Sequence, residues 1–110
     1  MNILIADDHA IVREGVKQII NTLPEVNLID EASDGNIAYT KILSKNYDLV
    51  VLDISMPGIT GLDLLQRLKN KDIKTNVLIL SFYPQEQYAI RAFKLGASGY
   101  YSKDNASEER

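Results

Sequence analysis

Polar side chains end or follow several of the short apolar runs in this 110-residue chain; they are Asp7, Asp8, Asp53, Ser81 and Lys103. Three carboxylates held close together repel one another, so without a partner one of them would bind a proton. A hard divalent cation removes this conflict, and Mg²⁺ prefers carboxylate and carbonyl oxygens together with water and phosphate oxygens. The acids therefore predict a magnesium site, provided that the fold brings them together.

The same residue types suit phosphoryl transfer. Mg²⁺, the Lys103 ammonium and the Ser81 hydroxyl would balance the charge that develops on a transferring phosphoryl group. A carboxylate can itself act as the nucleophile and form an aspartyl phosphate. Taken singly, each acid would more often be a solvated residue at the end of a strand. The joint pattern, an Asp pair after one apolar run and a lone Asp closing another, favours the site.

His9 follows the Asp pair directly. Histidine can carry protons and phosphoryl groups, but this one lies at the start of a predicted helix beside two acids, which favours a solvated or capping role.

A parallel sheet would position these side chains. Apolar runs rich in Val, Ile and Leu predict five strands, at residues 2–6, 26–32, 49–53, 77–81 and 99–102. Helical patterns separate the runs, and this alternation predicts an α/β fold whose parallel sheet is covered on both faces by helices. Ligands bind such sheets beyond the carboxyl ends of the strands, which is where the polar residues would meet.

The first helix is predicted to turn an apolar stripe toward the core: Ile11, Val12, Gly15, Val16, Ile19, Ile20 and Leu23. A second helix is expected from about residue 36 to 45. A third begins at Thr60, which has the spacing of a capping box with Asp63.

A fourth helix is predicted from Pro84 to Leu95, with Gly96 as its left-handed cap. The segment from Asn105 to Glu108 has the signals of a fifth helix start, where the chain ends. Truncation of this helix is expected to expose apolar surface near the first helix.

Composition narrows the class of protein. With no Cys, a disulfide scaffold and a thiolate zinc site are both excluded. The formal net charge is -3 and no basic cluster is present, which disfavours direct binding of nucleic acid by this segment. The apolar runs are too short to span a bilayer, and a signal peptide is not evident. A single cytoplasmic domain over residues 1–110 is expected, with no membrane contact.

Five motifs of the chain resemble the receiver domain of two-component response regulators: Ile5–His9, Leu49–Gly58, Gly61–Asp63, Leu78–Ser81 and Gly96–Lys103. The resemblance covers the whole chain. The Asp-Asp-His start, Val12–Gly15 and Lys103-Asp104 are similar to the subfamily of transcriptional regulators in which the receiver precedes a LuxR-type helix-turn-helix domain. That DNA-binding effector domain is absent from this chain.

This resemblance implies a doubly wound, flavodoxin-like (CheY-like) fold with strand order 2-1-3-4-5. It implies that Asp53 accepts a phosphoryl group from a sensor histidine kinase. Asp8 and Asp53 would bind Mg²⁺ through their carboxylates, Ser55 through its backbone carbonyl, and Asp7 through water. Lys103 would pair with the phosphoryl group.

The resemblance also implies a switch in which Ser81 donates to the phosphoryl oxygen and Tyr100 changes rotamer with it. Tyr100 could instead be an ordinary strand residue. A phosphorylation-dependent homodimer is expected, and DNA would be contacted only through the absent effector domain.

Other classes compete with this interpretation. A magnesium-dependent aspartyl-phosphate phosphatase or phosphotransferase would need a second acid two residues after the nucleophile, where Ser55 stands. A flavin-binding module would place a phosphate loop after the first strand, where Asp7 and Asp8 would repel the phosphate. A degenerate scaffold is disfavoured because the residue set is complete. The chain is therefore expected not to be an enzyme beyond self-phosphorylation and autodephosphorylation.

Overall fold

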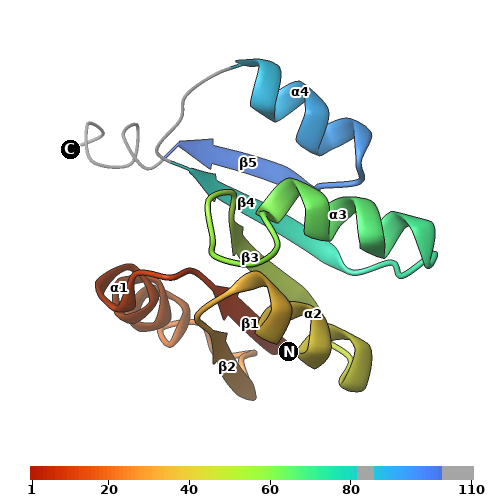
Figure 1. The fold of residues 1–110 in the computed structure, drawn as a ribbon. Helices are drawn as coiled ribbons and strands as arrows, with labels where there is room; N and C mark the ends of the chain where they lie inside the picture. Colours follow the sequence, from red (N-terminus) through yellow and green to blue (C-terminus); the bar gives the residue numbers. More distant parts are fainter. Residues whose placement is uncertain (82–85, 103–110) are drawn as a thin grey trace.

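Strands and helices alternate along the computed structural model, which describes residues 1–81 and 86–102 (Figure 1). The elements are β1 (Asn2–Ala6), α1 (Ala10–Ile20), β2 (Leu28–Ala32), α2 (Gly35–Ser44), β3 (Leu49–Asp53), α3 (Gly61–Asn70), β4 (Asn76–Ser81), α4 (Glu86–Lys94) and β5 (Gly99–Ser102). The predicted alternation is confirmed. None of these helices is long and apolar enough to cross a bilayer.

The strands form one sheet in the order β2-β1-β3-β4-β5, and every neighbouring pair is parallel. This is the predicted order. The strand order reverses at β1, because β2 lies on one side of β1 and β3 lies on the other (Figure 1). Such a switch point opens a crevice at the carboxyl ends of the two strands on which the order reverses.

Side chains of each strand alternate between two cores, because successive residues of a strand point to opposite faces. Leu4 and Ala6 join the larger core with residues of α2, α3 and α4. Ile3 and Ile5 join a smaller core with Ile20 of α1. Within the described part of the chain, α1 thus covers one face of the sheet, and α2, α3 and α4 cover the other (Figure 1).

The prediction that the whole apolar stripe of α1 faces the core is wrong. Ile20 is buried, but Ile11 is 87% exposed and Ile19 is 71% exposed. The apolar stripe covers about half of the helix circumference, with Ile11 and Ile20 at its two margins, so a sheet on one side cannot bury all of it. Leu23 lies beyond the end of the helix and is exposed, and Gly15 is exposed between the two isoleucines. The predicted cause of exposed apolar surface near this helix, truncation of a fifth helix, lies outside the described residues.

Several predicted boundaries shift slightly. β2 begins at Leu28 rather than at residue 26, because the Val26 N–H bonds back to the Leu23 carbonyl in a turn. Thr60 caps α3 as predicted, and its hydroxyl accepts from the Asp63 N–H at 3.2 Å. Gly96 has φ +104, which confirms the left-handed position after α4. The predicted start of α4 at residue 84 and the start of a fifth helix lie outside the described residues.

A buried tyrosine ties β2 to the loop before β3. The Tyr47 hydroxyl donates to the Asp30 carboxylate at 2.6 Å, and Lys45 Nζ lies 3.2 Å from the same oxygen. The hydrogen bond from Tyr47, helped by Lys45, lowers the pKa of Asp30 below 3.8, and burial followed by the bond to Asp30 raises the pKa of Tyr47. Because the folded pKa of Asp30 is depressed, its contribution to stability exists above the unfolded pKa and is lost as pH falls through the folded value.

We therefore expect Tyr47→Phe to destabilise the protein at pH 7 by about 1.5–3 kcal/mol, as for hydrogen bonds to charged groups. The difference in free energy of unfolding between wild type and Tyr47→Phe should become smaller as pH falls below 3.8 and Asp30 becomes protonated. Urea unfolding at a series of pH values measures both effects. Tyr39→Phe, at a ring that lies 5.5 Å from the Arg67 guanidinium, is the matched control and should show a pH-independent difference. A gap for Tyr47→Phe that does not change with pH would contradict this assignment.

Candidate functional site

The register of the sheet brings three predicted site residues to one edge. Ala6 of β1 pairs with Leu52 of β3, so Asp7 and Asp53 follow side by side. Asp53 pairs with Leu80 of β4, and Ser81 is the next residue along that strand. The predicted convergence at the carboxyl ends is confirmed for these three residues. Lys103 lies outside the described residues.

The three converging side chains are also buried. Asp7 is 2%, Asp53 4% and Ser81 1% exposed. Apart from Tyr47, they are the buried residues with hydroxyl or charged side chains in the described part of the chain. Two ionisable carboxyls rarely lie inside a small domain without pairing, because burial removes their water. Their position is therefore evidence for a site rather than for solvated strand ends.

Asp8 and His9 complete a compact cluster with these acids. Ligand atoms of Asp7, Asp8, His9 and Asp53 all lie within 4.8 Å of one another. The Asp8 side chain is 32% exposed, so one flank of the cluster is open to solvent. Carboxylates with an open flank can hold a hard cation that keeps part of its water, which fits the donor set that Mg²⁺ prefers.

The sequence predicts that His9 is solvated or caps the helix; the exposure of its ring agrees with the first role, and a side-chain cap is not observed. His9 occupies the N-cap of α1, but its side chain makes no capping hydrogen bond. Its Nδ1 instead lies 3.0 Å from Asp7 Oδ1 and 3.1 Å from Asp8 Oδ1, while the ring stays half-exposed. The backbone N–H of His9 donates to Asp7 Oδ1 at 2.8 Å. The ring thus contacts the acids rather than the helix N-terminus, and this contact gives the acid cluster a partner on the chain itself.

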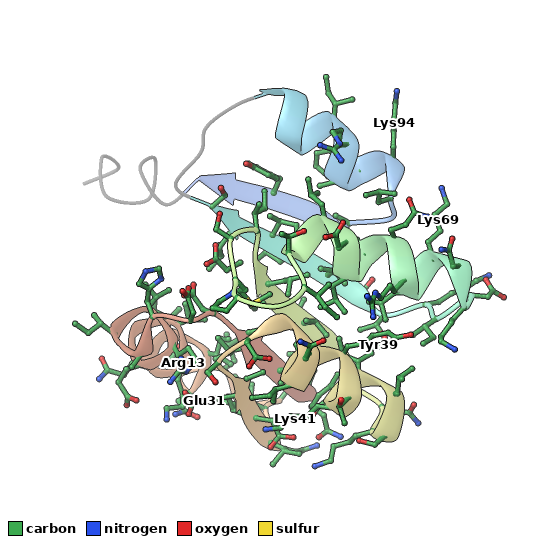
Figure 2. All side chains as sticks on the ribbon, viewed as in Figure 1. Arg13, Glu31, Tyr39, Lys41, Lys69 and Lys94 are labelled. Carbon is green, nitrogen blue, oxygen red and sulfur yellow. The ribbon has the colours of Figure 1, made fainter. Side chains whose placement is uncertain are left out.

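Sequence reasoning missed Arg13, which supports the cluster from α1. Its Nη1 donates to the Asp7 carbonyl at 2.7 Å and its Nε donates to the Glu31 carboxylate at 2.9 Å. Lys17 Nζ donates to the same carboxylate, and the bonds from Lys17 and Arg13 lower the pKa of Glu31. Figure 2 shows Arg13 and Glu31 side by side where α1 meets β2. Helical periodicity assigns a charged residue to solvent and so gave no signal for this contact.

The loop after β3 carries Ser55, the predicted carbonyl ligand. Ser55 is exposed, whereas Ile54 and Met56 on either side of it are buried. At the far end of the loop, the Gly61 N–H donates to the Ile54 carbonyl at 2.7 Å. The loop is thus anchored on both sides of Ser55, which places this residue two positions after Asp53 on a fixed backbone.

Ser81 and Tyr100, the predicted switch pair, lie on neighbouring strands. Ser81 ends β4, and Tyr100 of β5 pairs with Ile79 of the same strand. The Tyr100 side chain is partly buried and packs against the larger core. This arrangement puts both residues near the same sheet edge, and their coupled movement stays a prediction.

A groove of about 340 Å³ lies elsewhere, between the C-terminal ends of α3 and α4 and the start of β4. Its lining includes Lys69, Val77 and Lys94, and it shares no residue with the acid cluster. Figure 2 shows Lys69 and Lys94 on neighbouring helices. Lys69 Nζ donates to the Lys94 carbonyl at 3.0 Å. The groove is therefore separate from the acid cluster.

Comparison with known proteins gives consistent relatives. A family model described as the response regulator receiver domain matches residues 3–109. The nitrate/nitrite response regulator protein NarL of Escherichia coli (strain K12) is 37% identical over 107 residues, which are 97% of this chain and 50% of that protein. The chain spans about half the length of the curated relatives that it matches.

Solved structures agree with the fold. A two-component response regulator of the LuxR family from Aurantimonas sp. SI85-9A1 superposes with a TM-score of 0.85 at 34% identity, covering 93% of this chain and 73% of that chain. The CheX-CheY-BeF3-Mg complex from Borrelia burgdorferi gives a TM-score of 0.87 at 31% identity over 94% of this chain and 78% of that one. The expected CheY-like fold is confirmed.

Proposed function

Since the chain belongs to the response regulator receiver family, within the LuxR-type subfamily, we propose that it accepts a phosphoryl group on Asp53 from a sensor histidine kinase in a Mg²⁺-dependent reaction. The observation that carries this proposal is the position of Asp53. This carboxyl is buried at the carboxyl end of a central strand, and Asp7 and Asp8 lie within one ligand sphere of it.

In the transfer step, a carboxylate oxygen of Asp53 attacks the phosphorus of the phosphohistidine. The new O–P bond forms as the N–P bond breaks, and the imidazole nitrogen keeps the electron pair of the broken bond. The protein needs to supply no further covalent chemistry, because such transfers depend on positioning and on charge stabilisation. The end of β3, where Asp53 pairs with Leu80 of β4, provides the positioning.

Charge stabilisation requires a cation, because three carboxyls surround the site of a doubly charged phosphoryl group. When bound, Mg²⁺ supplies a Lewis acid that offsets the charge of carboxylate and phosphoryl oxygens together. We assign its direct binding to the carboxylates of Asp8 and Asp53 and the carbonyl of Ser55, with Asp7 acting through water. Lys103, outside the described residues, is proposed to pair with the phosphoryl group.

Phosphorylation is proposed to change the conformation through Ser81 and Tyr100. The Ser81 hydroxyl would donate to a phosphoryl oxygen, and Tyr100 would move toward the space that Ser81 leaves. The near-complete burial of Ser81 supports this role, because a buried hydroxyl that changes partner forces its neighbours to adjust.

The output of this switch belongs to the rest of a longer protein. The curated relatives are about twice the length of the chain and are named as response or transcriptional regulators. We propose a cytoplasmic receiver that controls an attached DNA-binding domain in transcription and forms a homodimer on phosphorylation. DNA contact is assigned to that attached domain only.

The second candidate is an aspartyl-phosphate phosphatase or phosphotransferase that acts on small phosphoesters. Such an enzyme needs an acid to protonate the leaving group, and the loop from 54 to 60 contains no Asp or Glu. We therefore propose that the chain turns over only its own phosphoryl group.

Incubation with phosphoramidate, followed by intact mass measurement, tests the proposal. With Mg²⁺ present, we expect the gain of one phosphoryl group per chain; after removal of the metal with EDTA, we expect none. A folded protein that gains no phosphoryl group in Mg²⁺ would contradict the proposal. Rapid release of phosphate over many turnovers would favour the phosphatase instead.

A further inference from the structure

The loop that follows Asp53 touches two helix N-termini through glycines. At its far end, Gly61 begins α3, and a Cβ at this position would collide with the Asp53 carbonyl oxygen and lie 2.9 Å from the Ile54 Cα. This contact joins α3 to the phosphoacceptor strand itself. The contact with α2 involves a segment distant in sequence, and it supports the middle of the loop.

Gly35, the first residue of α2, meets the middle of the loop backbone to backbone. Its N–H donates to the Pro57 carbonyl at 3.2 Å. A Cβ at Gly35 would collide with the Ile59 carbonyl oxygen and lie 2.8 Å from the Ile59 Cβ. Real Cβ atoms do not approach backbone this closely, so a side chain at Gly35 requires that the loop or the helix moves.

The loop presents a glycine of its own to the same turn. Gly58 has φ +80, a conformation that glycine adopts readily and other residues rarely do. A Cβ there would lie 2.6 Å from Asn36 Nδ2, next to Gly35 in sequence. Because Gly35 on the helix and Gly58 on the loop both lack a side chain, the two backbones can approach each other closely.

Neither partner of this contact can retreat easily. On the helix side, Ala38 and Ile42 are buried in the larger core, and the Asp34 carboxylate fixes the first turn by accepting from the Ile37 N–H at 2.8 Å. On the loop side, Ile59 is 5% exposed. A Cβ at Gly35 would therefore strain the contact, and any shift of the loop that relieves the strain would move the backbone between its anchors, where Ser55 lies.

We propose that Gly35 is a positioning residue for the metal site: the first turn of α2 holds the loop from 54 to 60 so that the Ser55 carbonyl stays within reach of a cation bound at Asp8 and Asp53. This inference rests on the proposed function, which assigns the Ser55 carbonyl to Mg²⁺. Supports of this kind set metal affinity although they touch no ligand atom, because they fix the orientation of a group that does.

Gly35→Ala tests this assignment, and Gly15→Ala is its matched control because a Cβ at Gly15 meets nothing within 4 Å. A Mg²⁺ titration followed by NMR should show about tenfold or greater loss of affinity for Gly35→Ala, the scale expected for outer supports of a metal. Gly15→Ala should bind as wild type does. The Mg²⁺ concentration for half-maximal phosphorylation should rise in parallel for Gly35→Ala, while the rate at saturating Mg²⁺ stays near that of wild type.

Two further comparisons separate positioning from loss of stability. Ile20→Ala, in the smaller core away from the loop, should lower the unfolding temperature without changing Mg²⁺ affinity. Asp34→Ala removes the cap of α2, whereas Asp34→Asn removes the charge and keeps a capping side chain. We expect weaker Mg²⁺ binding for Asp34→Ala and wild-type binding for Asp34→Asn. If Gly35→Ala does not fold, this comparison tests whether the first turn of α2 sets Mg²⁺ affinity, and equal affinities of the two Asp34 variants would contradict it.

The outcomes distinguish this inference from the function on which it rests. A wild-type protein that binds no Mg²⁺ overturns both. A wild type that binds Mg²⁺ together with a folded Gly35→Ala of equal affinity overturns only the role of Gly35. Equal losses in Gly35→Ala and Ile20→Ala would also overturn it, since both would then follow from stability alone.

Discussion

Asp53→Asn is expected to reduce phosphoryl incorporation to an undetectable level while the fold remains intact. Asparagine matches aspartate in shape, so the buried space at the end of β3 stays filled. Its amide oxygen is a poor nucleophile, because the amide carries no negative charge, and an acyl phosphate cannot form. Intact mass after incubation with phosphoramidate and Mg²⁺ measures the loss.

Asp53→Asn should lose phosphorylation but gain thermal stability. Asp7, Asp8 and Asp53 are close enough to repel, so neutralising one of them should raise the unfolding temperature in the absence of divalent cations. Mg²⁺ should then stabilise wild type more than Asp53→Asn, since ligand binding stabilises only the form that binds. Asp72→Asn, at a side chain that is 86% exposed, is the charge-matched control and should do neither. Full incorporation in Asp53→Asn would rule out this residue as the phosphoacceptor.

Among the variants proposed, Leu64→Ala is expected to lower the free energy of unfolding the most. Leu64 is fully buried in the larger core, and truncation of such a leucine leaves a cavity that costs about 2–5 kcal/mol. That is a large part of the about 5–15 kcal/mol by which domains of this kind are stable. Leu43→Ala, on an exposed position of α2, should stay within about 0.5 kcal/mol of wild type.

Urea unfolding at pH 7 measures both leucine variants. Equal midpoints for Leu64→Ala and Leu43→Ala would show that the larger core does not pack as the structure indicates. A loss in both variants of several kcal/mol would point instead to an unrecognised contact of Leu43.

The central strands were predictable because they carry the least ambiguous pattern. Val50 and Val51, like the other residues of β3, belong to an uninterrupted apolar run closed by an acid, and the structure has the strand at the predicted residues. The wide apolar arc of α1 was misleading, because helical periodicity does not say which part of an arc meets the sheet. Ile11 and Ile20 fit the same pattern, yet one is exposed and the other buried.

The acids of the candidate site were predictable for a related reason. A polar residue at the carboxyl end of a parallel strand has its place fixed by the fold, and this holds for Asp7, Asp53 and Ser81. The supports are harder to find in a sequence. Arg13 is a charged helix residue like many others, and Gly35 fits an ordinary helix start, so only the approach of distant backbone shows what each does.

The strand order also constrains when the site can come into existence. β1 pairs directly with β3, although α1, β2 and α2 all lie between them in the chain. Pairings between such distant segments must overcome the entropy of closing a long loop before their contacts compensate, and they slow folding. On a ribosome, the acid cluster can form only after β3 has left the exit tunnel, because Asp7 and Asp8 are made long before Asp53. A nascent chain that has not yet released β3 therefore lacks the acid cluster, and under the proposed function it could not yet accept a phosphoryl group.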